Sequence, residues 1–481
     1  MRRVALGRWF LGALVGAALL LSACLPSIPP PVTGLSASVT SSSVSLSWTN
    51  PPDSFWGVRV YRAEGSTPPV GPAQGAPPGA YLADVGDGAS YVDGGLPAGA
   101  TYSYSVIVYG ADGYYSSPAT VSATAPIPAA DIAAGDLHTC GRPGNGTVRC
   151  WGAGNNGQLG NGGLVESLTP VTVSGITTAT QVTAGNVHTC APLDDGTVRC
   201  WGSGTYGQLG NGSTSLASSP VAVTGISTAT QVSAGGYHTC AVLIDGTVRC
   251  WGRNNHGQLG NGTTTTAPTS SPVTVAGIST ATQVHAGDFH TCALLADTTV
   301  RCWGLNSSGQ LGNGSTTTSS TPVTVAGLST ATQIATGYFH SCARLADGTA
   351  RCWGNNLYGQ LGNGTSGSPS STPVTVSGIA TATQLTAGGD YHSCAVLSDG
   401  TARCWGVGTW GQLGDGTYAS STTPVTVSGI GTATQIAAAY RHSCALLADG
   451  TIRCWGYNVS GQLGDGTHDG SPVPVAVGGF P

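Results

Sequence analysis

Alternating apolar and polar positions recur through most of this chain. The segment 238–252 reads HTCAVLIDGTVRCWG, and its period of two predicts a β-hairpin. A three-residue loop, Ile244-Asp245-Gly246, joins the two strands, with glycine where the turn needs a positive φ. Counting outward from this loop places Cys240 directly opposite Cys250. Alternation puts these two cysteines on one face of the hairpin with His238, while Arg249 and Trp251 share the other face.

The same hairpin pattern occurs seven times between His138 and Gly466, with starts 50 or 52 residues apart. A period of about fifty residues is typical of blade or solenoid units, which bury their apolar faces only against neighbouring units. The sequence therefore predicts an all-β repeat domain, which we expect to span residues 128–481.

Cysteine spacing agrees with the repeat count. Fourteen of the fifteen cysteines form pairs ten positions apart: Cys140 with Cys150, Cys190 with Cys200, Cys240 with Cys250, Cys292 with Cys302, Cys342 with Cys352, Cys394 with Cys404, and Cys444 with Cys454. Thiols opposite each other on antiparallel strands lie close to disulfide distance, so we expect seven local disulfides. Pairing between repeats stays open at this stage. A zinc site is disfavoured, because such sites usually bring two close ligand pairs into one tetrahedron.

Each repeat also carries one histidine and one arginine at a fixed place. We interpret the histidines as hydrogen-bonding core residues, not metal ligands: His138, His188, His238, His290, His340, His392 and His442. We expect the arginines to stack on tryptophan or to bond to backbone: Arg149, Arg199, Arg249, Arg301, Arg351, Arg403 and Arg453.

Residues 32–125 have a different sequence pattern, with no cysteine and no fifty-residue repeat. Segments such as 43–48 and 101–106 alternate with period two between turn residues, which predicts a β-sandwich. The landmarks Leu46-Ser47-Trp48 and Leu96-Pro97-Ala98-Gly99 resemble a fibronectin type III module, in which Trp48 would be a core residue. We expect this domain to be a spacer or a mild adhesive module.

The N-terminus predicts export. Three arginines precede an apolar run, residues 9–21, which is too short to span a bilayer comfortably. The run ends in Leu21-Ser22-Ala23-Cys24, which resembles a bacterial lipobox and implies cleavage of residues 1–23 and lipidation of Cys24. The alternative is an ordinary cleavable signal with an incidental cysteine. Residues 24–31 are rich in proline and would form a stiff tether. The resemblance implies a lipoprotein of the cell envelope or outer-membrane surface, in an oxidising compartment where disulfides persist.

Composition narrows the partner classes. Charged residues make up 8% of the chain, the formal net charge is −5 and lysine is absent, so no basic face is expected to neutralise phosphates, and nucleic acid is disfavoured as a partner. We expect no metal, no small-molecule cofactor and a monomeric chain.

The repeat, completed by Gly257-Gln258-Leu259-Gly260 and the edge-like strand Pro272-Val273-Thr274-Val275, resembles the RCC1 repeat, named for the regulator of chromosome condensation. The resemblance covers every repeat and implies one seven-bladed β-propeller. The first repeat lacks an upstream Pro-Val-x-Val strand, so we expect residues 474–477 to complete the first blade. Two departures stand out. Thr298 replaces the turn glycine of the fourth hairpin, which predicts a strained or differently built turn, and Arg142-Pro143-Gly144 predicts a looser edge in the first repeat.

Specificity should come from positions that differ between repeats. The residue before the framework histidine is Tyr237, Phe289, Phe339, Tyr391 or Arg441 in the last five repeats, and these residue types dominate protein interfaces. We take these five as partner-binding candidates; the alternative is that the aromatics only pack between blades. A second variable set lies ahead of Gly-Gln-Leu-Gly, on the same or the opposite rim: Tyr206, His256, Tyr358, Trp410 and Tyr457.

The pattern favours a surface-anchored binding protein whose partner is a protein. One alternative is an inhibitor of a secreted or periplasmic enzyme, since β-lactamase-inhibitory propellers of this family carry aromatics at similar positions. Another is a glycan-active enzyme, in which Asp136, Asp288 and Asp390 would meet near a central channel; no paired acid or base supports it, and no catalytic residue is assigned. Guanine-nucleotide exchange, the activity associated with the family, is disfavoured for an exported acidic chain.

Overall fold

This computed structural model describes residues 28–40, 43–69, 81–94, 96, 99–111, 113–124, 127, 129–389 and 391–480. The predicted signal peptide (1–23), Cys24 and Asp390 lie outside these residues. Every regular element of the described chain is a β-strand, and no helix there is long and apolar enough for a membrane span. Contacts divide the chain into two compact units, with the division between residues 125 and 126.

The N-terminal unit contains two antiparallel sheets that share one core. The strand orders are β1-β2-β5 and β4-β3-β6-β7, and the bounds are β1 (Thr33–Thr40), β2 (Ser43–Thr49), β3 (Gly57–Glu64), β4 (Tyr81–Asp84), β5 (Ser90–Gly94), β6 (Thr101–Tyr109) and β7 (Ala119–Thr124). Val44, Leu46 and Trp48 of β2 pack with Val60 of β3 and Tyr104 of β6. Trp48 is buried, as predicted.

The C-terminal unit contains seven four-stranded antiparallel sheets among its described residues, numbered here sheet 1 to sheet 7 in chain order. Sheets 1 to 3 comprise β8 (Ala129–Ala134), β9 (His138–Pro143), β10 (Arg149–Gly152), β11 (Ser167–Thr172); β12 (Thr183–Ala184), β13 (His188–Pro192), β14 (Val198–Gly202), β15 (Ala217–Ala222); and β16 (Ala229–Ala234), β17 (His238–Leu243), β18 (Val248–Asn254), β19 (Thr265–Thr274). Sheets 4 and 5 comprise β20 (Ala281–Ala286), β21 (His290–Leu295), β22 (Val300–Gly304), β23 (Ser319–Thr324); and β24 (Ala331–Thr336), β25 (His340–Leu345), β26 (Ala350–Gly354), β27 (Ser370–Thr375). Sheets 6 and 7 comprise β28 (Ala382–Ala387), β29 (His392–Leu397), β30 (Ala402–Gly406), β31 (Ser421–Thr426); and β32 (Ala433–Ala438), β33 (His442–Leu447), β34 (Ile452–Gly456), β35 (Ser471–Ala476).

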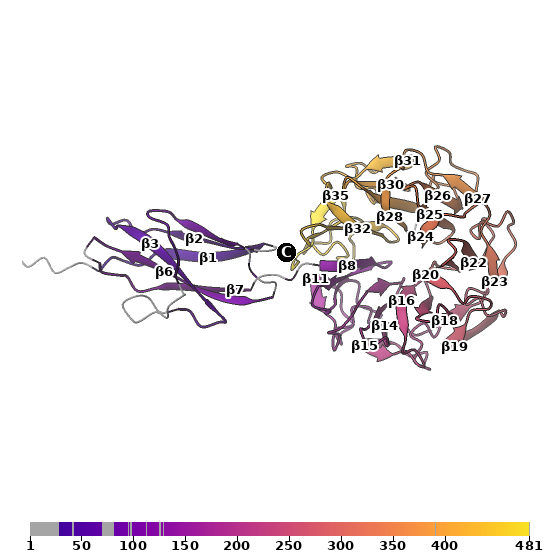
Figure 1. Ribbon diagram of the computed structural model, residues 1–481, viewed down its shortest axis with the longest axis horizontal. Coiled ribbons are helices and arrows are strands. Elements are labelled where there is room, and N and C mark those ends of the chain that lie inside the picture. The colour runs from indigo at the N-terminus through magenta and orange to yellow at the C-terminus, as the bar shows by residue number, and fades with distance from the viewer. Residues whose placement is uncertain are drawn as a thin grey trace, which may run out of the picture. The chain divides into compact units, whose positions relative to one another are not determined.

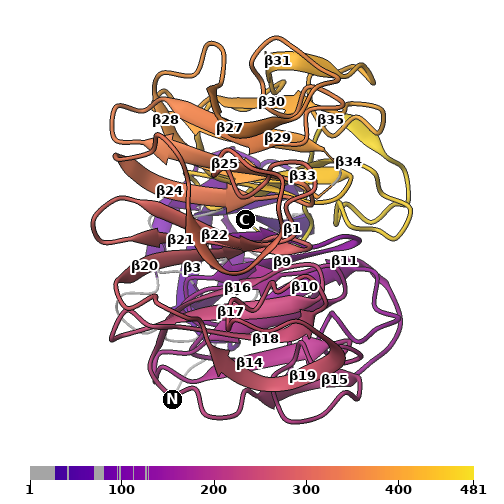
Figure 2. The same cartoon turned by 90° about the vertical axis from the view of Figure 1, so that its right-hand side faces the viewer.

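These sheets stand side by side around a circle, with the first strand of each sheet toward the centre (Figure 1). Figure 2 shows the same sheets from the side of the ring. Consecutive first strands contact one another, and β32 of sheet 7 contacts β8 of sheet 1. The arrangement is therefore a ring of four-stranded sheets, as the repeats predict.

The predicted seam is wrong. Residues 471–476 form β35, which pairs with β34 of the last sheet and places Val475 opposite Cys454. Sheet 1 takes its innermost strand, β8, from the residues just before its own hairpin. Ala129 and Ile132 supply the small and apolar side chains that β8 buries. The Pro-Val-x-Val strand follows its hairpin in every sheet, so each sheet is one continuous stretch of chain.

The hairpin register is as expected. Cys240 lies opposite Cys250, and Val242 opposite Val248. Both sulfurs of each disulfide belong to the same hairpin, with S–S distances between 2.06 and 2.12 Å.

The seven disulfides follow the predicted local pairing, and none joins two repeats. They link Cys140 to Cys150, Cys190 to Cys200, Cys240 to Cys250, Cys292 to Cys302, Cys342 to Cys352, Cys394 to Cys404, and Cys444 to Cys454. No described cysteine is exposed to solvent. Each disulfide therefore ties the two middle strands of one sheet together inside the core.

The fourth hairpin keeps the turn of its neighbours despite Thr298. The φ angle of Thr298 is 66°, compared with 77° for Gly246 at the equivalent place in sheet 3. The turn is thus strained, because a β-branched residue occupies the left-handed region. Of the two predicted outcomes, a strained turn or a differently built one, the first is confirmed. The Thr298 hydroxyl donates a hydrogen bond to the Ser329 carbonyl, which holds the turn in place.

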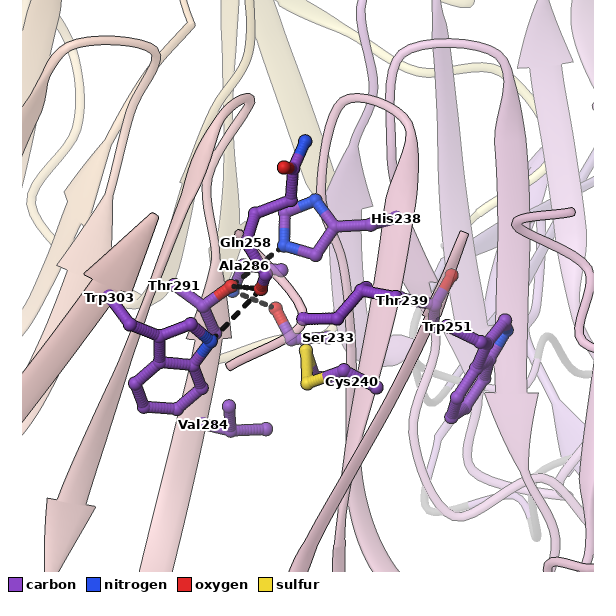
Figure 3. Close-up of a disulfide and its surroundings, with 12 residues drawn as sticks. Ser233, His238, Thr239, Cys240, Trp251, Gln258, Val284, Ala286, Thr291 and Trp303 are labelled. Carbon is purple, nitrogen blue, oxygen red and sulfur yellow. Dashed lines mark hydrogen bonds between the residues drawn. A yellow bond between two sulfur atoms is a disulfide. The ribbon is translucent and has the colours of Figure 1, made fainter. Parts of the chain in front are cut away.

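A repeated hydrogen-bond relay joins neighbouring sheets (Figure 3). The Thr291 hydroxyl of sheet 4 donates to the Gln258 carbonyl of sheet 3 at 2.9 Å, so it accepts from His238 Nε2 at 2.8 Å. The indole Nε1 of Trp303 donates to the same Gln258 carbonyl. Gly260 follows in this loop because a Cβ there would lie 2.6 Å from Trp303 Nε1.

All seven framework histidines make this bond to a threonine or serine hydroxyl of the next sheet, at 2.8–2.9 Å. His442 completes the circle by bonding to Thr139 of sheet 1. Burial lowers the pKa of His238 from its usual 6.5 to about 3. A neutral imidazole with its proton on Nε2 fits this environment, and the predicted core role of these histidines agrees with it.

The framework arginines behave only partly as expected. Arg149 donates to the Gly479 carbonyl at 2.7 Å, which is the predicted backbone bond. Its guanidinium lies over the Phe480 ring, and in the described part of the chain no framework arginine stacks on a tryptophan. The reason is that each indole is enclosed against the preceding sheet, as Trp251 is by its bond to the Gln208 carbonyl.

Glutamines connect the innermost strands, which are not hydrogen-bonded to one another as a sheet. Gln231 of β16 accepts from the Val284 N–H and donates to the Val284 carbonyl of β20. Gln333 makes the same two hydrogen bonds to the backbone of Leu385, and Gln384 makes them to the backbone of Ile436. Sheet 1 has Asp131 at this place, and its carboxylate accepts from the Val182 N–H at 2.8 Å.

Candidate partner-binding face and central channel

The partner-binding candidates lie together at one end of the ring. Each occupies the turn between the innermost strand and the hairpin of its sheet, directly before the framework histidine. Their side chains are partly exposed: Tyr237, Phe289, Phe339, Tyr391 and Arg441. The position therefore allows packing among neighbours and contact with a partner at the same time.

Three of these aromatics form a continuous row across sheets 4 to 6. The ring centroids of Phe289 and Phe339 are 5.8 Å apart. Phe339 and Tyr391 stack at 6.2 Å with an interplanar angle of 13°. Tyr391 has a φ of 65°, in a turn that is one residue longer than its counterpart in sheet 4. Packing between sheets thus aligns the aromatics and leaves one side of the row accessible.

The second variable set lies on the same rim, which the sequence had left open. Tyr206 packs edge-on against Tyr237 with centroids 5.2 Å apart, and His256 packs against Phe289 at 5.6 Å. Tyr358 lies 5.3 Å from Tyr391. Trp410 and Tyr457 contact each other at 4.8 Å. We call the ten residues of the two sets, together with Arg253, the aromatic rim.

Arginine side chains hold the two ends of the aromatic rim. Arg253 lies over the rings of Tyr206, Tyr237 and Phe289, at 5.1, 5.6 and 5.4 Å. Arg441 lies over Trp410 at 4.9 Å and Tyr457 at 5.7 Å. Sequence reasoning missed Arg253, although comparison of the residues that follow each Trp-Gly step would have found it: Ala153, Ser203, Arg253, Leu305, Asn355, Val407 and Tyr457.

The aromatic rim is on sheets 2 to 7, and its first variable set lies next in sequence to the residues at the mouth of a central channel, whose volume is about 390 Å³. The mouth residues precede the rim positions by one or two places in each sheet: Asp136, Asn186, Gly236, Asp288, Tyr338, Gly389 and Tyr440. The innermost strands line the rest of the channel. Candidate acids Asp136 and Asp288 are therefore brought to one cavity, as the sequence predicted, while Asp390 lies outside the described residues.

Two glycines let side chains of non-adjacent sheets meet in this mouth. A Cβ at Gly236 would lie 1.5 Å from Asp288 Oδ1, so glycine there allows Asp288 of sheet 4 to reach Asn186 of sheet 2. Asn186 Nδ2 donates to Asp288 Oδ1 at 3.0 Å. Gly389 acts in the same way for Tyr338 of sheet 5 and Tyr440 of sheet 7. A Cβ at Gly389 would lie 3.0 Å from Tyr338 Cε1, and the two ring centroids are 5.3 Å apart.

The electrostatics of the mouth are unusual. Burial, with a contribution from the charge of Asp136, raises the pKa of Asp288 to about 7, although Asn186 and Arg253 oppose the change. Burial also raises the pKa of Tyr338, and the carboxylates of Asp136 and Asp288 add to that effect. Among the described residues no three histidine, cysteine, aspartate or glutamate side chains gather as a metal site would require.

Family comparison agrees with this architecture. The RCC1-like domain profile matches residues 228–480, more than half of the chain. Regulator of chromosome condensation (RCC1) repeat profiles match residues 145–191, 195–242, 129–158 and 179–208. The chain therefore belongs to the RCC1-like repeat proteins. No curated protein sequence matches it.

Solved structures share the fold at low identity. Yeast RCC1 (Prp20), solved bound to Kap60, is 22% identical with a TM-score of 0.60, covering 73% of this chain and 84% of Prp20. A second structure of Prp20p, from Saccharomyces cerevisiae, is 22% identical with a TM-score of 0.61, covering 73% of this chain and 86% of Prp20p. Human WBSCR16 gives 21% and 0.61, over 81% and 99%. Identities this low establish the fold of the C-terminal unit and nothing more.

Proposed function

We propose that this protein is a lipid-anchored binding protein of the bacterial cell envelope, in which a closed seven-bladed RCC1-like propeller presents the aromatic rim to a protein partner. The N-terminal unit would be a fibronectin type III-like spacer, which its three-stranded and four-stranded sheets around Trp48 support. Lipidation of Cys24 would hold the chain at a membrane. Yeast Prp20, of the same fold, was solved bound to a protein.

The aromatic rim carries the proposal. Aromatic and arginine side chains provide most of the binding energy in protein interfaces, particularly where they are already fixed by packing. Here the stack of Phe339 on Tyr391 and the arginine clamps at both ends fix the rim before any partner arrives. Single exposed apolar residues elsewhere need no such explanation.

The test is capture of partners from intact cells by the full-length protein and its alanine variants at Tyr237, Phe289, Phe339 and Tyr391. Each change should weaken capture of the same partner by about tenfold or more, which corresponds to the loss of a typical hot spot. Tyr418→Ala is the matched control, because Tyr418 is 57% exposed and lies outside the rim. Retention of the partner by all four rim variants would exclude the proposed face.

Enzyme inhibition is a specific form of the same function. The rim presents packed aromatic side chains from several neighbouring sheets and would cover the active-site entrance of a secreted enzyme. A captured enzyme that loses turnover on adding this protein, and regains it with Phe339→Ala, would establish inhibition. The glycan-active alternative depends on Asp288, whose raised pKa is a property of general acids; it requires glycan turnover that Asp288→Asn abolishes.

A further inference from the structure

The channel mouth differs chemically from the aromatic rim around it. The rim is aromatic and carries two arginines, whereas the mouth brings two carboxylates and two tyrosines to one cavity. A partner that covers the rim must therefore place some group over this mouth, and the chemistry of the mouth determines which group fits.

Asp288 is the residue that points to a ligand. Its side chain is 3% exposed, and among the described residues its hydrogen bonding is limited to Oδ1, which accepts from Asn186. The residue lines the channel, and no described donor bonds to its second oxygen. Buried carboxylates usually accept several hydrogen bonds or pair with a cation, so this site has acceptor capacity that a ligand can use.

The charge balance of the mouth favours a cation. The Asp136 carboxylate adds negative charge beside Asp288, and the positive charge of Arg253 offsets it only in part, because the pKa of Asp288 still rises to about 7. An entering positive group would stabilise the ionised form of the buried Asp288 and its neighbour. An entering anion would increase the repulsion.

Shape and aromaticity favour a planar cation over a compact one. Tyr338 and Tyr440 form a ring pair in the lining of the same cavity, with centroids 5.3 Å apart. A guanidinium can stack on such a ring while its edge bonds to a carboxylate. One such stack is already present, since the Arg441 guanidinium lies over the Tyr440 ring at 4.6 Å.

We propose that the channel mouth binds one arginine side chain of the protein partner, with its guanidinium paired to Asp288 and Asp136 and stacked at the Tyr338–Tyr440 pair. The inference rests on the proposed function, because the rim delivers the arginine. It goes further by naming the group at the centre of the interface. Asn186 and Gly236 act as positioning residues, since one holds Asp288 Oδ1 and the other leaves room for it.

Calorimetric titration of the full-length protein with Nα-acetyl-arginine methylamide tests the site without needing the partner. The citrulline analogue has nearly the same shape and no charge, and should bind at least tenfold more weakly. The lysine analogue should also bind more weakly, because a compact ammonium does not stack. Equal affinity for citrulline would overturn the ion pairing, and equal affinity for lysine would overturn the guanidinium assignment.

Variants locate the binding. Asp288→Asn and, separately, Asp136→Asn should each reduce the affinity for the arginine amide at least fivefold. Asp469→Asn removes one exposed carboxylate outside the mouth and should leave the affinity unchanged. Binding that survives both mouth variants would overturn the proposal, and thermal unfolding of each variant verifies that it is folded.

The two proposals can fail separately. If arginine does not bind but the Phe339→Ala variant loses its partner, the mouth proposal is wrong and the rim proposal stands. If arginine binds through Asp288 while all rim variants retain their partners, the rim proposal is wrong.

Discussion

At the scale of single residues, the hydroxyl that follows each framework histidine is the central component of the contact between sheets. It accepts from the histidine of the preceding sheet and donates to the glutamine carbonyl that also receives the tryptophan. The histidine and the glutamine carbonyl thus both depend on one hydroxyl group, and the tryptophan shares the carbonyl. Sequence alone predicted buried hydrogen-bonding histidines, but it did not reveal the acceptor, because that hydroxyl lies in the next repeat.

Thr291→Val should therefore destabilise the protein by about 1–3 kcal/mol, since the isosteric change leaves the buried His238 Nε2–H and the Gln258 carbonyl with one bond fewer each. Thr274→Val is the matched control, because Thr274 is exposed on the outermost strand of sheet 3. Denaturant unfolding of both variants measures the difference. Equal midpoints would mean that the relay contributes nothing to stability.

The strained turn gives a second prediction at this scale. Thr298→Gly should raise stability slightly, by up to about 1 kcal/mol, because glycine adopts φ near 66° without steric cost. The loss of the hydrogen bond to the Ser329 carbonyl offsets part of this gain. The reverse change in sheet 3, Gly246→Thr, should destabilise, since a Cβ there would lie 2.6 Å from the Ser279 carbonyl. Calorimetric melting of the pair checks both signs, and a loss of stability in Thr298→Gly would show that the hydrogen bond outweighs the strain.

At the scale of elements, the innermost strands depend on side chains for their connection. A glutamine amide offers a donor and an acceptor, so it can replace a missing backbone pair, as Gln231 does at Val284. An ionised aspartate can only accept. Asp131 consequently connects its strand to the next one more weakly than a glutamine would. Burial raises the pKa of Asp131 to about 6.

Asp131→Gln should stabilise the protein above pH 6. In the folded state Asp131 has a pKa above its unfolded value, so the native carboxyl favours its protonated form, and the stability that this group contributes is lost as pH rises through about 6. The gain from the glutamine should therefore be larger at pH 8 than at pH 5. Gln231→Glu is the converse control and should destabilise at pH 8. A gain that is independent of pH would contradict this account.

The sequence predicted the elements well and their joining poorly. Hairpin register followed from alternation and the Asp-Gly turn, and this register alone was enough to pair Cys240 with Cys250. The seam could not be predicted, because the strand 129–134 carries mainly alanine and resembles a linker. The common location of the two variable sets was also hidden, since Tyr206 and Tyr237 belong to different repeats and meet only across a sheet boundary.

At the scale of the whole molecule, the ring closes by contact between sheets 7 and 1, without exchange of a strand. Trp151 of sheet 1 donates to the Gln462 carbonyl of sheet 7. Phe480 adds a contact specific to this boundary, with its ring centroid 5.8 Å from that of Trp151. Closure thus uses the bonds of every other boundary together with one additional aromatic residue.

Phe480→Ala should cost about 3–5 kcal/mol if its site cannot collapse, because the side chain is buried against sheet 1. Phe339→Ala, of the same chemistry but partly exposed on the rim, should cost less. Denaturant unfolding with both variants tests the ranking. A smaller cost at Phe480 than at Phe339 would mean that the final residues do not secure the boundary.

Seven neutral buried histidines also make the whole ring sensitive to acid. Their pKa values are lowered to about 3 or 4 in the folded state, so the unfolded chain binds more protons below pH 6.5. The stability that these histidines contribute should be complete above that pH and should fall steadily between pH 6.5 and about 4. Burial also lowers the pKa of His285, to about 4. Asp131 and Asp288 change in the opposite direction, but they are two groups against eight. Thermal unfolding from pH 7.5 to 4.5 measures the trend, and a midpoint that rises on acidification would refute it.

Because every sheet is a single uninterrupted stretch of chain, no strand pairing crosses the boundary between sheets 7 and 1. New ends could be opened between any two neighbouring sheets, with the old ends linked, and the circularly permuted ring would retain all its strand pairings. Gain or loss of one complete repeat is possible by the same logic, which offers a direct route by which such rings could change their diameter.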